Sequence, residues 1–226
     1  MAFNIAIDGP AGAGKSTIAK ALAERLGYVY VDTGAMYRAM AYFFLQKGIA
    51  KDDEPGVVAA VDGADVTIRY GDGVQQVFLN GENVTGFLRT EQVGNMASHT
   101  SVYPAVRKKL VALQQKLAET TDVIMDGRDI GTCVLPDAQV KIYLTASVQT
   151  RAKRRYEELL AKGETPDLTK IEADIEERDH RDMNREMSPL RKAEDALLVD
   201  SSSLTIDEVV DRILAIVKEK QGWLWK

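Results

Sequence analysis

The sequence has one cysteine, Cys133, and two histidines, His99 and His180. A single cysteine excludes an internal disulfide, and with it the small secreted folds that disulfides staple. These three residues are scattered along the chain, so they do not form the closely spaced Cys/His cluster of a zinc site. We therefore expect Cys133 to be a small, buried, apolar side chain rather than a reactive thiol.

Long hydrophobic runs and an excess of positive charge are also missing. No apolar run approaches the roughly 18 residues that cross a bilayer, and the chain enters a strand without the segments of a signal peptide. The 29 Lys and Arg are outnumbered by 34 Asp and Glu, a formal net charge of −5. This charge argues against a protein that coats nucleic acid. We expect a cytoplasmic protein that binds neither membranes nor nucleic acid, with one main domain and a modest insertion.

The residues from Gly9 to Ser16 match the P-loop pattern G-x-x-x-x-G-K-[ST] between an apolar run at 3–7 and a helical pattern at 17–26. Glycines let backbone N–H groups turn inward, and the following helix adds the positive end of its dipole. Lys15 is expected to reach the β- and γ-phosphates, and Ser16 to ligate Mg²⁺. The candidate ATP-binding residues are Gly9, Pro10, Ala11, Gly12, Ala13, Gly14, Lys15, Ser16 and Thr17. Kinases, GTPases, motors and transport ATPases share this loop, so it does not identify the acceptor.

Buried-type apolar runs predict strands at 3–7, 28–31, 123–126, 140–144 and 196–200, most of them followed by helical patterns. This alternation predicts an α/β fold with a doubly wound, five-stranded parallel sheet. Alternating segments at 65–70 and 75–79, joined by Gly71-Asp72-Gly73, predict an antiparallel insertion, and Asn80-Gly81 gives it a second tight turn before Val84-Thr85. We interpret this insertion as a substrate-side subdomain.

The helical segments carry their own signals. Asp32-Thr33-Gly34 is expected to be a turn before a helix at 35–45, and Pro104 to be the first residue of a later helix. Capping boxes at 169–172 and 205–208 predict helices from Ile171 to about Arg185 and from Val209 to Val217. After Ser147, a helix carries Arg151, Arg154 and Arg155, followed by a break at 163–166. A lid that closes over the substrates would bring such cations, carried beside a flexible segment, to the phosphoryl group that is transferred.

Three further groups of residues point to a ligand. Tyr37 and Arg38 lie within a turn of a helix start that follows a strand, where open α/β sheets bind ligands. Arg128 is flanked by two carboxylates at another strand's carboxyl end, which is costly without a ligand. Arg178, then Arg181 or Asp182, and then Arg185 follow at helical spacings of three or four, so they share one face of a predicted helix.

The sequence closely resembles the bacterial cytidylate kinases, members of the nucleoside monophosphate kinase family, over nearly its whole length. The resemblance is carried by the segments 8–16, 32–38, 126–132, 136–138 and 178–185. It implies transfer of the γ-phosphoryl group of MgATP to CMP or dCMP, giving ADP and CDP or dCDP in pyrimidine metabolism. It also implies a core at 1–36 and 90–226 with a helical lid at about 151–170. An NMP-binding region at 37–89 would hold the antiparallel insertion at about 57–89. The family is commonly monomeric, and we expect a monomer.

The resemblance also assigns roles to residues of this chain. The implied cytosine readers are Ser98, Arg107 and Asp129; the acceptor-phosphate contacts are Arg38, Arg128 and Arg185; the ribose contacts are Arg178 and Asp182; and Thr33 and Tyr37 line the same site. The expected catalytic residues are Lys15, Arg128, Asp129 and Arg185, with Arg151, Arg154 and Arg155 as lid candidates. Thr33 stands where many relatives have serine.

The chemistry of Asp129 agrees independently with this reading. Cytosine offers an exocyclic N4 amine, for which a carboxylate is the natural acceptor, whereas uracil presents a carbonyl oxygen and is rejected. A related small-molecule kinase, with UMP or shikimate as acceptor, is the alternative within enzymes. A GTPase switch would need an Asn-Lys-x-Asp guanine reader, and an ABC-type ATPase a Leu-Ser-Gly-Gly-Gln signature. Neither motif occurs in the sequence.

Overall fold

The computed structural model describes residues 2–71 and 74–224. Its strands are β1 (Asn4–Asp8), β2 (Val29–Asp32), β3 (Val66–Gly71), β4 (Val74–Leu79), β5 (Glu82–Asn83), β6 (Val123–Gly127), β7 (Val140–Thr145) and β8 (Leu197–Asp200). The α-helices are α1 (Lys15–Leu26), α2 (Thr33–Gln46), α3 (Glu54–Ala60), α4 (Glu91–Thr100), α5 (Pro104–Thr120), α6 (Val148–Ala161), α7 (Leu168–Asn184) and α8 (Ile206–Leu224). Shorter turns are η1 (Val61–Gly63), η2 (Thr85–Phe87) and the π-helical η3 (Ile130–Val134).

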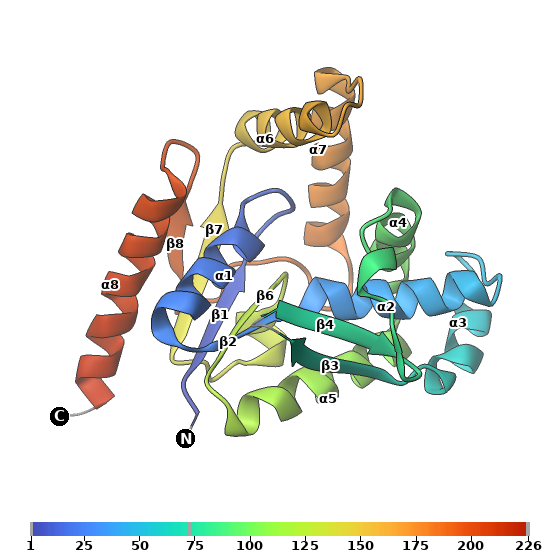
Figure 1. Ribbon diagram of the computed structural model, residues 1–226, viewed down its shortest axis with the longest axis horizontal. Helices are drawn as coiled ribbons and strands as arrows, with labels where there is room; N and C mark the ends of the chain where they lie inside the picture. Colours follow the sequence, from blue (N-terminus) through green and yellow to red (C-terminus); the bar gives the residue numbers. More distant parts are fainter. Residues whose placement is uncertain (1, 72–73, 225–226) are drawn as a thin grey trace. The chain divides into compact units, whose positions relative to one another are not determined.

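A five-stranded sheet has the order β2-β6-β1-β7-β8. Strand β1 lies in its middle and pairs in parallel with β6 and β7, and β7 pairs in parallel with β8 (Figure 1). A separate three-stranded sheet has the order β3-β4-β5 and is antiparallel. The predicted α/β fold of a P-loop protein, with its parallel sheet and antiparallel insertion, is confirmed.

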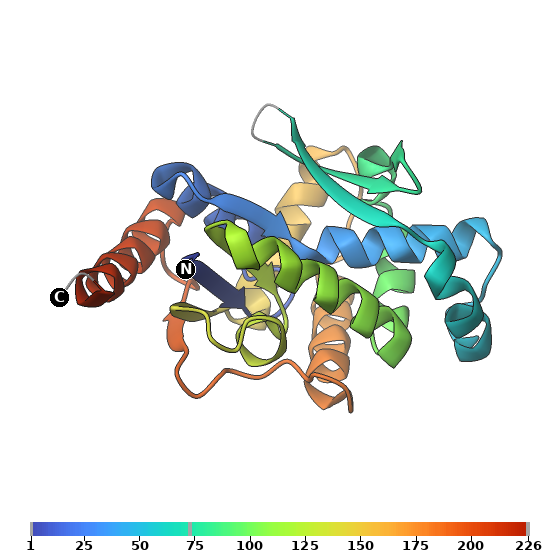
Figure 2. The ribbon, with the colours of Figure 1, turned by 90° about the horizontal axis from the view of Figure 1, so that it is seen from below.

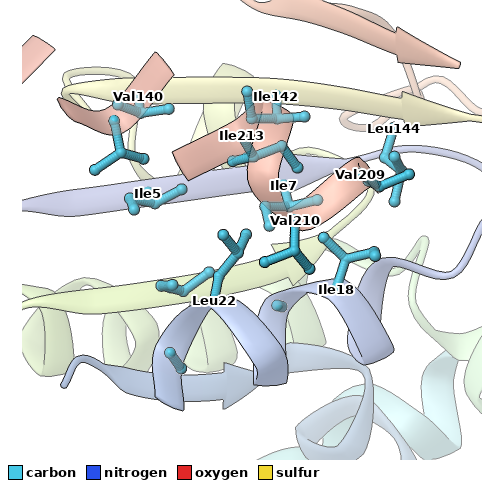
Figure 3. Close-up of a cluster of buried hydrophobic side chains, with 14 of the residues drawn as sticks. Ile5, Ile7, Ile18, Leu22, Val140, Ile142, Leu144, Val209, Val210 and Ile213 are labelled. Carbon is cyan, nitrogen blue, oxygen red and sulfur yellow. The ribbon is translucent and has the colours of Figure 1, made fainter. Parts of the chain in front are cut away.

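The chain divides into two compact units, one of residues 1–30 and 120–226 and the other of residues 31–119. In the first, α1, β1, β7 and α8 share a core (Figure 3). Along β7 the residues Val140, Ile142 and Leu144 are buried in alternation, because successive side chains of a strand point to opposite faces. Ile18 and Leu22 of α1 are four positions apart and lie on one helix face. This core holds the end of β1 and the start of α1, and therefore the loop that joins them.

In the second unit, helix α2 packs against α4 and against strand β4, and Figure 2 shows the β3–β4 ribbon running along α2. The two-residue turn between β4 and β5 has φ of 50° at Asn80 and 86° at Gly81. Positive φ at both central residues is the type I′ geometry that matches strand twist, so the predicted Asn-Gly turn is confirmed. Strand β5 precedes Val84-Thr85, and in the predicted turn Gly71-Asp72-Gly73 the last two residues lie outside the described residues.

Several helix starts differ from the predictions because a different residue caps them. Asp32 accepts a hydrogen bond from the backbone N of Ala35, so α2 begins at Thr33 and the predicted turn is wrong. Asp167 likewise caps α7, which begins at Leu168 instead of using the box at 169–172. The box at Thr205 and Glu208 is confirmed, since each residue's side chain accepts from the other's backbone N at 3.3 and 2.8 Å. Helix α5 does begin at Pro104.

Two other observations bear on the predictions. Cys133 is half-buried rather than fully buried, and its sulfur accepts a hydrogen bond from the hydroxyl of Ser188 at 3.5 Å. Within residues 2–71 and 74–224, no helix combines the length and the apolarity that a membrane crossing requires. The functional roles predicted for residues 37–89 and 151–170 stay predictions.

Candidate active site

The P-loop follows β1 and contains three glycines with positive φ: Gly9 at 151°, Gly12 at 77° and Gly14 at 89°. A Cβ at Gly9 would lie 1.9 Å from the carbonyl oxygen of Leu144, inside any allowed contact. Gly14 is the left-handed residue before α1. A side chain at Gly9 would clash with Leu144, and the positive φ disfavours a side chain at each of the three glycines. The backbone of this loop is therefore left open to a ligand.

Lys15 is buried at the start of α1, and its Nζ donates to the carbonyl oxygen of Pro10 at 2.7 Å. Burial, together with the nearby charge of Arg128, lowers the pKa of Lys15 to about 7, although Asp126 and Asp8 act in the opposite direction. An anionic phosphate would favour the charged lysine. The predicted phosphate-binding lysine therefore lies in its loop, in a setting where an anion would strongly change its protonation.

Ser16 and Asp126 form the group that suits a cation. The Oγ of Ser16 donates to Oδ2 of Asp126 at 2.9 Å, and Tyr30 Oη donates to Oδ1 of the same carboxylate at 2.8 Å. Asp126 lies near the end of β6 and pairs in register with Ile7 of β1. Hard oxygen donors of this kind are those that Mg²⁺ takes from a protein, so these residues fit the predicted metal.

Asp8, the last residue of β1, orients the turn that follows β6. Its two carboxylate oxygens accept from the backbone N of Ile130 and of Gly131, both at 2.7 Å. Burial raises the pKa of Asp8 to about 6, although these two hydrogen bonds act in the opposite direction. Asp8 thus fixes the backbone immediately after Arg128 and Asp129.

Two ion pairs with little access to solvent connect this turn with α7 and the residues after it. Nε of Arg128 donates to Oδ2 of Asp182 at 2.8 Å. Burial raises the pKa of Asp182, but Arg128 outweighs it and the pKa is held below its usual value. Nη2 of Arg185 lies 3.5 Å from Oδ1 of Asp129, and both side chains are only 7% exposed. Buried charges are stable when they are paired and hydrogen-bonded, so four of the predicted residues form one charged cluster.

Arg178 is half-buried on α7, one turn before Asp182. Its charge contributes to lowering the pKa of both Lys15 and Asp182. It therefore adds to the positive potential around the P-loop and the Arg128–Asp129 turn. The structure brings the predicted ribose contacts, Arg178 and Asp182, onto the same helix.

The three lid candidates on α6 differ from one another. Arg151 is buried and donates to Ala146, Ala11 and Asp179. Arg154 donates to the carbonyl oxygen of Ser201 at 2.7 Å. Arg155 is half-exposed and pairs with Glu158 on its own helix at 2.9 Å. Arg151 and Arg154 thus lie beside the P-loop, whereas Arg155 pairs on its own helix.

The remaining predicted residues lie in the unit 31–119. Thr33 is buried at the start of α2, and Arg38 pairs with Asp32 at 3.1 Å. The guanidinium of Arg107, buried on α5, lies 5.9 Å from the ring centroid of Tyr37, within cation–π range. Ser98 is half-buried on α4, and its backbone carbonyl accepts from the Ser101 hydroxyl.

A family model described as cytidylate kinase matches residues 5–219 of this chain. The chain belongs to the cytidylate kinase family. It is 51% identical over 220 residues to the cytidylate kinase of Geobacillus sp. strain WCH70, covering 97% of this chain and 98% of the relative. It is 49% identical over 222 residues to that of Carboxydothermus hydrogenoformans, covering 98% and 100%. Membership makes this cytidylate kinase a nucleotide-binding phosphotransferase.

Solved structures resemble the fold of this cytidylate kinase at low sequence identity. An uncharacterized protein from Eubacterium ventriosum has a TM-score of 0.54 at 14% identity, covering 96% of this chain and 98% of its own. A gluconokinase from Sinorhizobium meliloti has a TM-score of 0.51 at 15% identity, covering 99% and 96%. At such identities the likeness shows the fold alone.

The structure adds site residues that the sequence reading of this cytidylate kinase missed. Asp126 lies two residues before Arg128 in the sequence, and in the structure it accepts from Ser16. Nη2 of Arg89 lies 3.0 Å from Oδ2 of Asp32, the carboxylate that also holds Arg38. The position of Asp126 at the end of a buried strand is a sequence signal from which its place in the site could have been predicted. No such signal marks Arg89, because its partner Asp32 lies 57 residues away in the sequence.

Proposed function

We propose that this cytidylate kinase transfers the γ-phosphoryl group of MgATP to CMP or dCMP, producing ADP and CDP or dCDP. The observation that carries the proposal is the Arg128–Asp129 turn, held by Asp8 and paired with Asp182 and Arg185, on the same compact unit as the P-loop. A carboxylate at this turn suits the exocyclic amine of cytosine, and adjacent guanidinium groups suit a phosphate. The names of the relatives support the same reaction.

On the donor side, the residues from Gly9 to Thr17 bind the phosphates of ATP. Backbone N–H groups of the loop and the start of α1 face the anion, and Lys15 adds a charge that phosphate stabilises. Ser16 would hold Mg²⁺, together with Asp126. When bound, Mg²⁺ offsets the negative charge of the phosphates and orients them.

On the acceptor side, each role follows from the side chain's chemistry. Asp129 accepts from cytosine N4, and Arg107 and Ser98 complete the recognition of the base. Arg38, Arg128 and Arg185 bind the phosphate of CMP, Arg178 and Asp182 the ribose, and Thr33 and Tyr37 line the site. The buried pair with Asp182 fixes the orientation of the Arg128 guanidinium before substrate binds. Preorganised donors of this kind need no reorganisation during the reaction.

The transfer itself needs no protein nucleophile. A phosphoryl group passes through a loose transition state, so the protein contributes alignment and electrostatic stabilisation. Lys15 and Arg128 neutralise the transferring charge, and Arg185 and Asp129 keep the acceptor in line. The lid at about 151–170 excludes water, which would otherwise hydrolyse ATP. We propose further that the protein works as a cytoplasmic monomer on free nucleotides, without nucleic acid or membrane partners.

The experiment that tests this function is a comparison of acceptors. ADP release from MgATP is followed with CMP, dCMP, UMP, AMP and shikimate, for the natural protein and for Asp129→Asn. We expect strong turnover of CMP and dCMP, and an asparagine amide that donates to uracil O4 should reduce the preference for CMP over UMP by about 100-fold or more.

The matched control is Asp137→Asn, since Asp137 is exposed and its loss should leave the preference unchanged. The alternative is a P-loop kinase with UMP or shikimate as acceptor. Equal turnover of UMP or shikimate by the natural protein, or ADP release that ignores every acceptor, would refute the proposal in favour of that alternative or of a hydrolase.

A further inference from the structure

Arg151 is an arginine with almost no access to solvent. Its side chain is 4% exposed, and it lies at the start of α6, where it was expected to serve a lid. Nε donates to the carbonyl oxygen of Ala146 at 2.9 Å, Nη1 to that of Ala11 at 3.0 Å, and Nη2 to Oδ2 of Asp179 at 2.6 Å. Burying a guanidinium is costly unless its donors find acceptors, and here each of the three nitrogens donates to one.

The contact with Ala11 reaches the middle of the P-loop. Ala11 lies next to Gly12, and a Cβ at Gly12 would be only 3.3 Å from the Cβ of Arg151. The aliphatic part of the Arg151 side chain therefore packs on the loop, next to the point where its guanidinium donates to the carbonyl oxygen of Ala11. Because that carbonyl is held by a protein donor, it is directed away from any anion in the loop, whose N–H groups remain for phosphate.

The contact with Asp179 ties the same guanidinium to α7. Asp179 is buried, and α6 packs against α7. One helical turn further along α7, Asp182 accepts from Arg128 at the end of β6. Residues three apart share a helix face, so one face of α7 anchors both Arg151, which holds the P-loop, and Arg128, which is proposed to bind the acceptor phosphate.

We propose that Arg151 is a positioning residue for the P-loop, locked in place by Asp179, and not a lid cation that closes on the transferring phosphate. The Arg151–Asp179 pair keeps the loop in its phosphate-binding shape and places it on the same helix face that orients Arg128. The inference deepens the proposed function and rests on its assignment of ATP to the P-loop. It does not depend on the identity of the acceptor.

The experiment measures binding of MgATP, through a non-hydrolysable analogue and without any acceptor, by calorimetry. Arg151→Lys keeps the charge but loses the guanidinium fork that reaches Ala11 and Asp179 together, and Asp179→Asn keeps the shape but loses the charge that holds this fork. We expect each variant to weaken nucleotide binding about ten-fold, the size of one such bond. The double variant should weaken it by no more than about the same factor, because both changes break one unit.

A lid cation predicts a different pattern. Arg151→Lys would then lower kcat with little change in nucleotide affinity, and Asp179→Asn would leave affinity unchanged or improve it by releasing the arginine. Unchanged affinity in Asp179→Asn, or losses that add in the double variant, would overturn the proposal. The control is Arg25→Gln with Asp207→Asn, an exposed pair outside the proposed lid, which should affect neither constant.

A second measurement separates positioning from general unfolding. Hydrogen exchange of the amides at 9–14 should accelerate in Asp179→Asn, while the amides of the β1, β7 and α8 core keep their natural rates. Uniform acceleration throughout the unit would mean that the pair only stabilises the fold, and would overturn the proposal. If the natural protein binds the ATP analogue but does not phosphorylate CMP, the proposed acceptor fails and this result still stands.

Discussion

Burial of the Asp8 carboxylate disfavours its charged form, and this makes the stability of the folded protein depend on pH. Its pKa is raised to about 6 from an ordinary 3.8, so the folded protein holds this proton more tightly than the unfolded chain. The stabilisation is fully present below about pH 4 and is lost as the pH rises through about 6. An asparagine at this position does not titrate, so it contributes no such pH-dependent stabilisation.

We therefore expect the free energy of unfolding of the natural protein, relative to that of Asp8→Asn, to fall by about 2 kcal/mol from about pH 4.5 to about pH 7.5. Urea denaturation at a series of pH values measures this difference, with the exposed Asp137→Asn as the control for losing one charge. A constant difference across the series would show that the raised pKa is wrong.

Single residues also show the limit of prediction from sequence. Lys15, Ser16 and Arg128 could be found because a local motif or a strand end marks them. The pairs that orient them could not, because Arg128 and Asp182 are 54 residues apart and Arg151 and Ala11 are 140 apart. The interpretation of Arg151 depends on the burial of its side chain, which the sequence does not show. An arginine in a helical pattern is usually interpreted as a surface charge until its neighbours are known. Because the Arg151 side chain is buried, a structural role competes with the lid role that the sequence predicts.

At the scale of elements, helix α1 packs on the core through Leu22, a large and fully buried side chain. We expect Leu22→Ala to lower the free energy of unfolding by about 2–5 kcal/mol, because it leaves a cavity between α1 and the sheet. Leu26→Ala is the control, since Leu26 is only partly buried against the same core and should cost less. Chemical denaturation measures both. Equal losses at the two positions would show that α1 does not pack as described.

Strands were easier to predict than helix starts, and the reason is physical. A strand such as β7 is read from apolar alternation that the sheet itself requires. A helix start depends on which of several polar residues accepts from the first turn. At α7 both Asp167 and Thr169 can cap a helix, and the helix starts after Asp167, whose carboxylate accepts from the backbone N of Lys170. At α8 the threonine and glutamate act together and the predicted box is confirmed, but the helix begins at Ile206, before the predicted Val209, and extends to Leu224.

For the whole molecule, charge agrees with the proposed substrates. The formal net charge is −5, while the arginines proposed to bind phosphate lie in pairs with carboxylates. Such pairs keep cations ready for an anion without giving the surface the broad positive field that binds nucleic acid nonspecifically. Both sets of predicted acceptor contacts contain this motif, Arg38 with Asp32 in one unit and Arg128 with Asp182 in the other.

The predicted monomer can be tested at an exposed edge of the parallel sheet. Strand β8 lies at the edge of the parallel sheet and exposes Leu197 and Leu198, by 44% and 55%. Exposed edge strands are templates for pairing with another chain, but β8 has only four residues, and short edges pair weakly. We expect sedimentation to give the monomer mass at micromolar protein, with and without nucleotides. A dimer would contradict this expectation. If Leu198→Lys then restored the monomer mass, the edge of β8 would be the site of association.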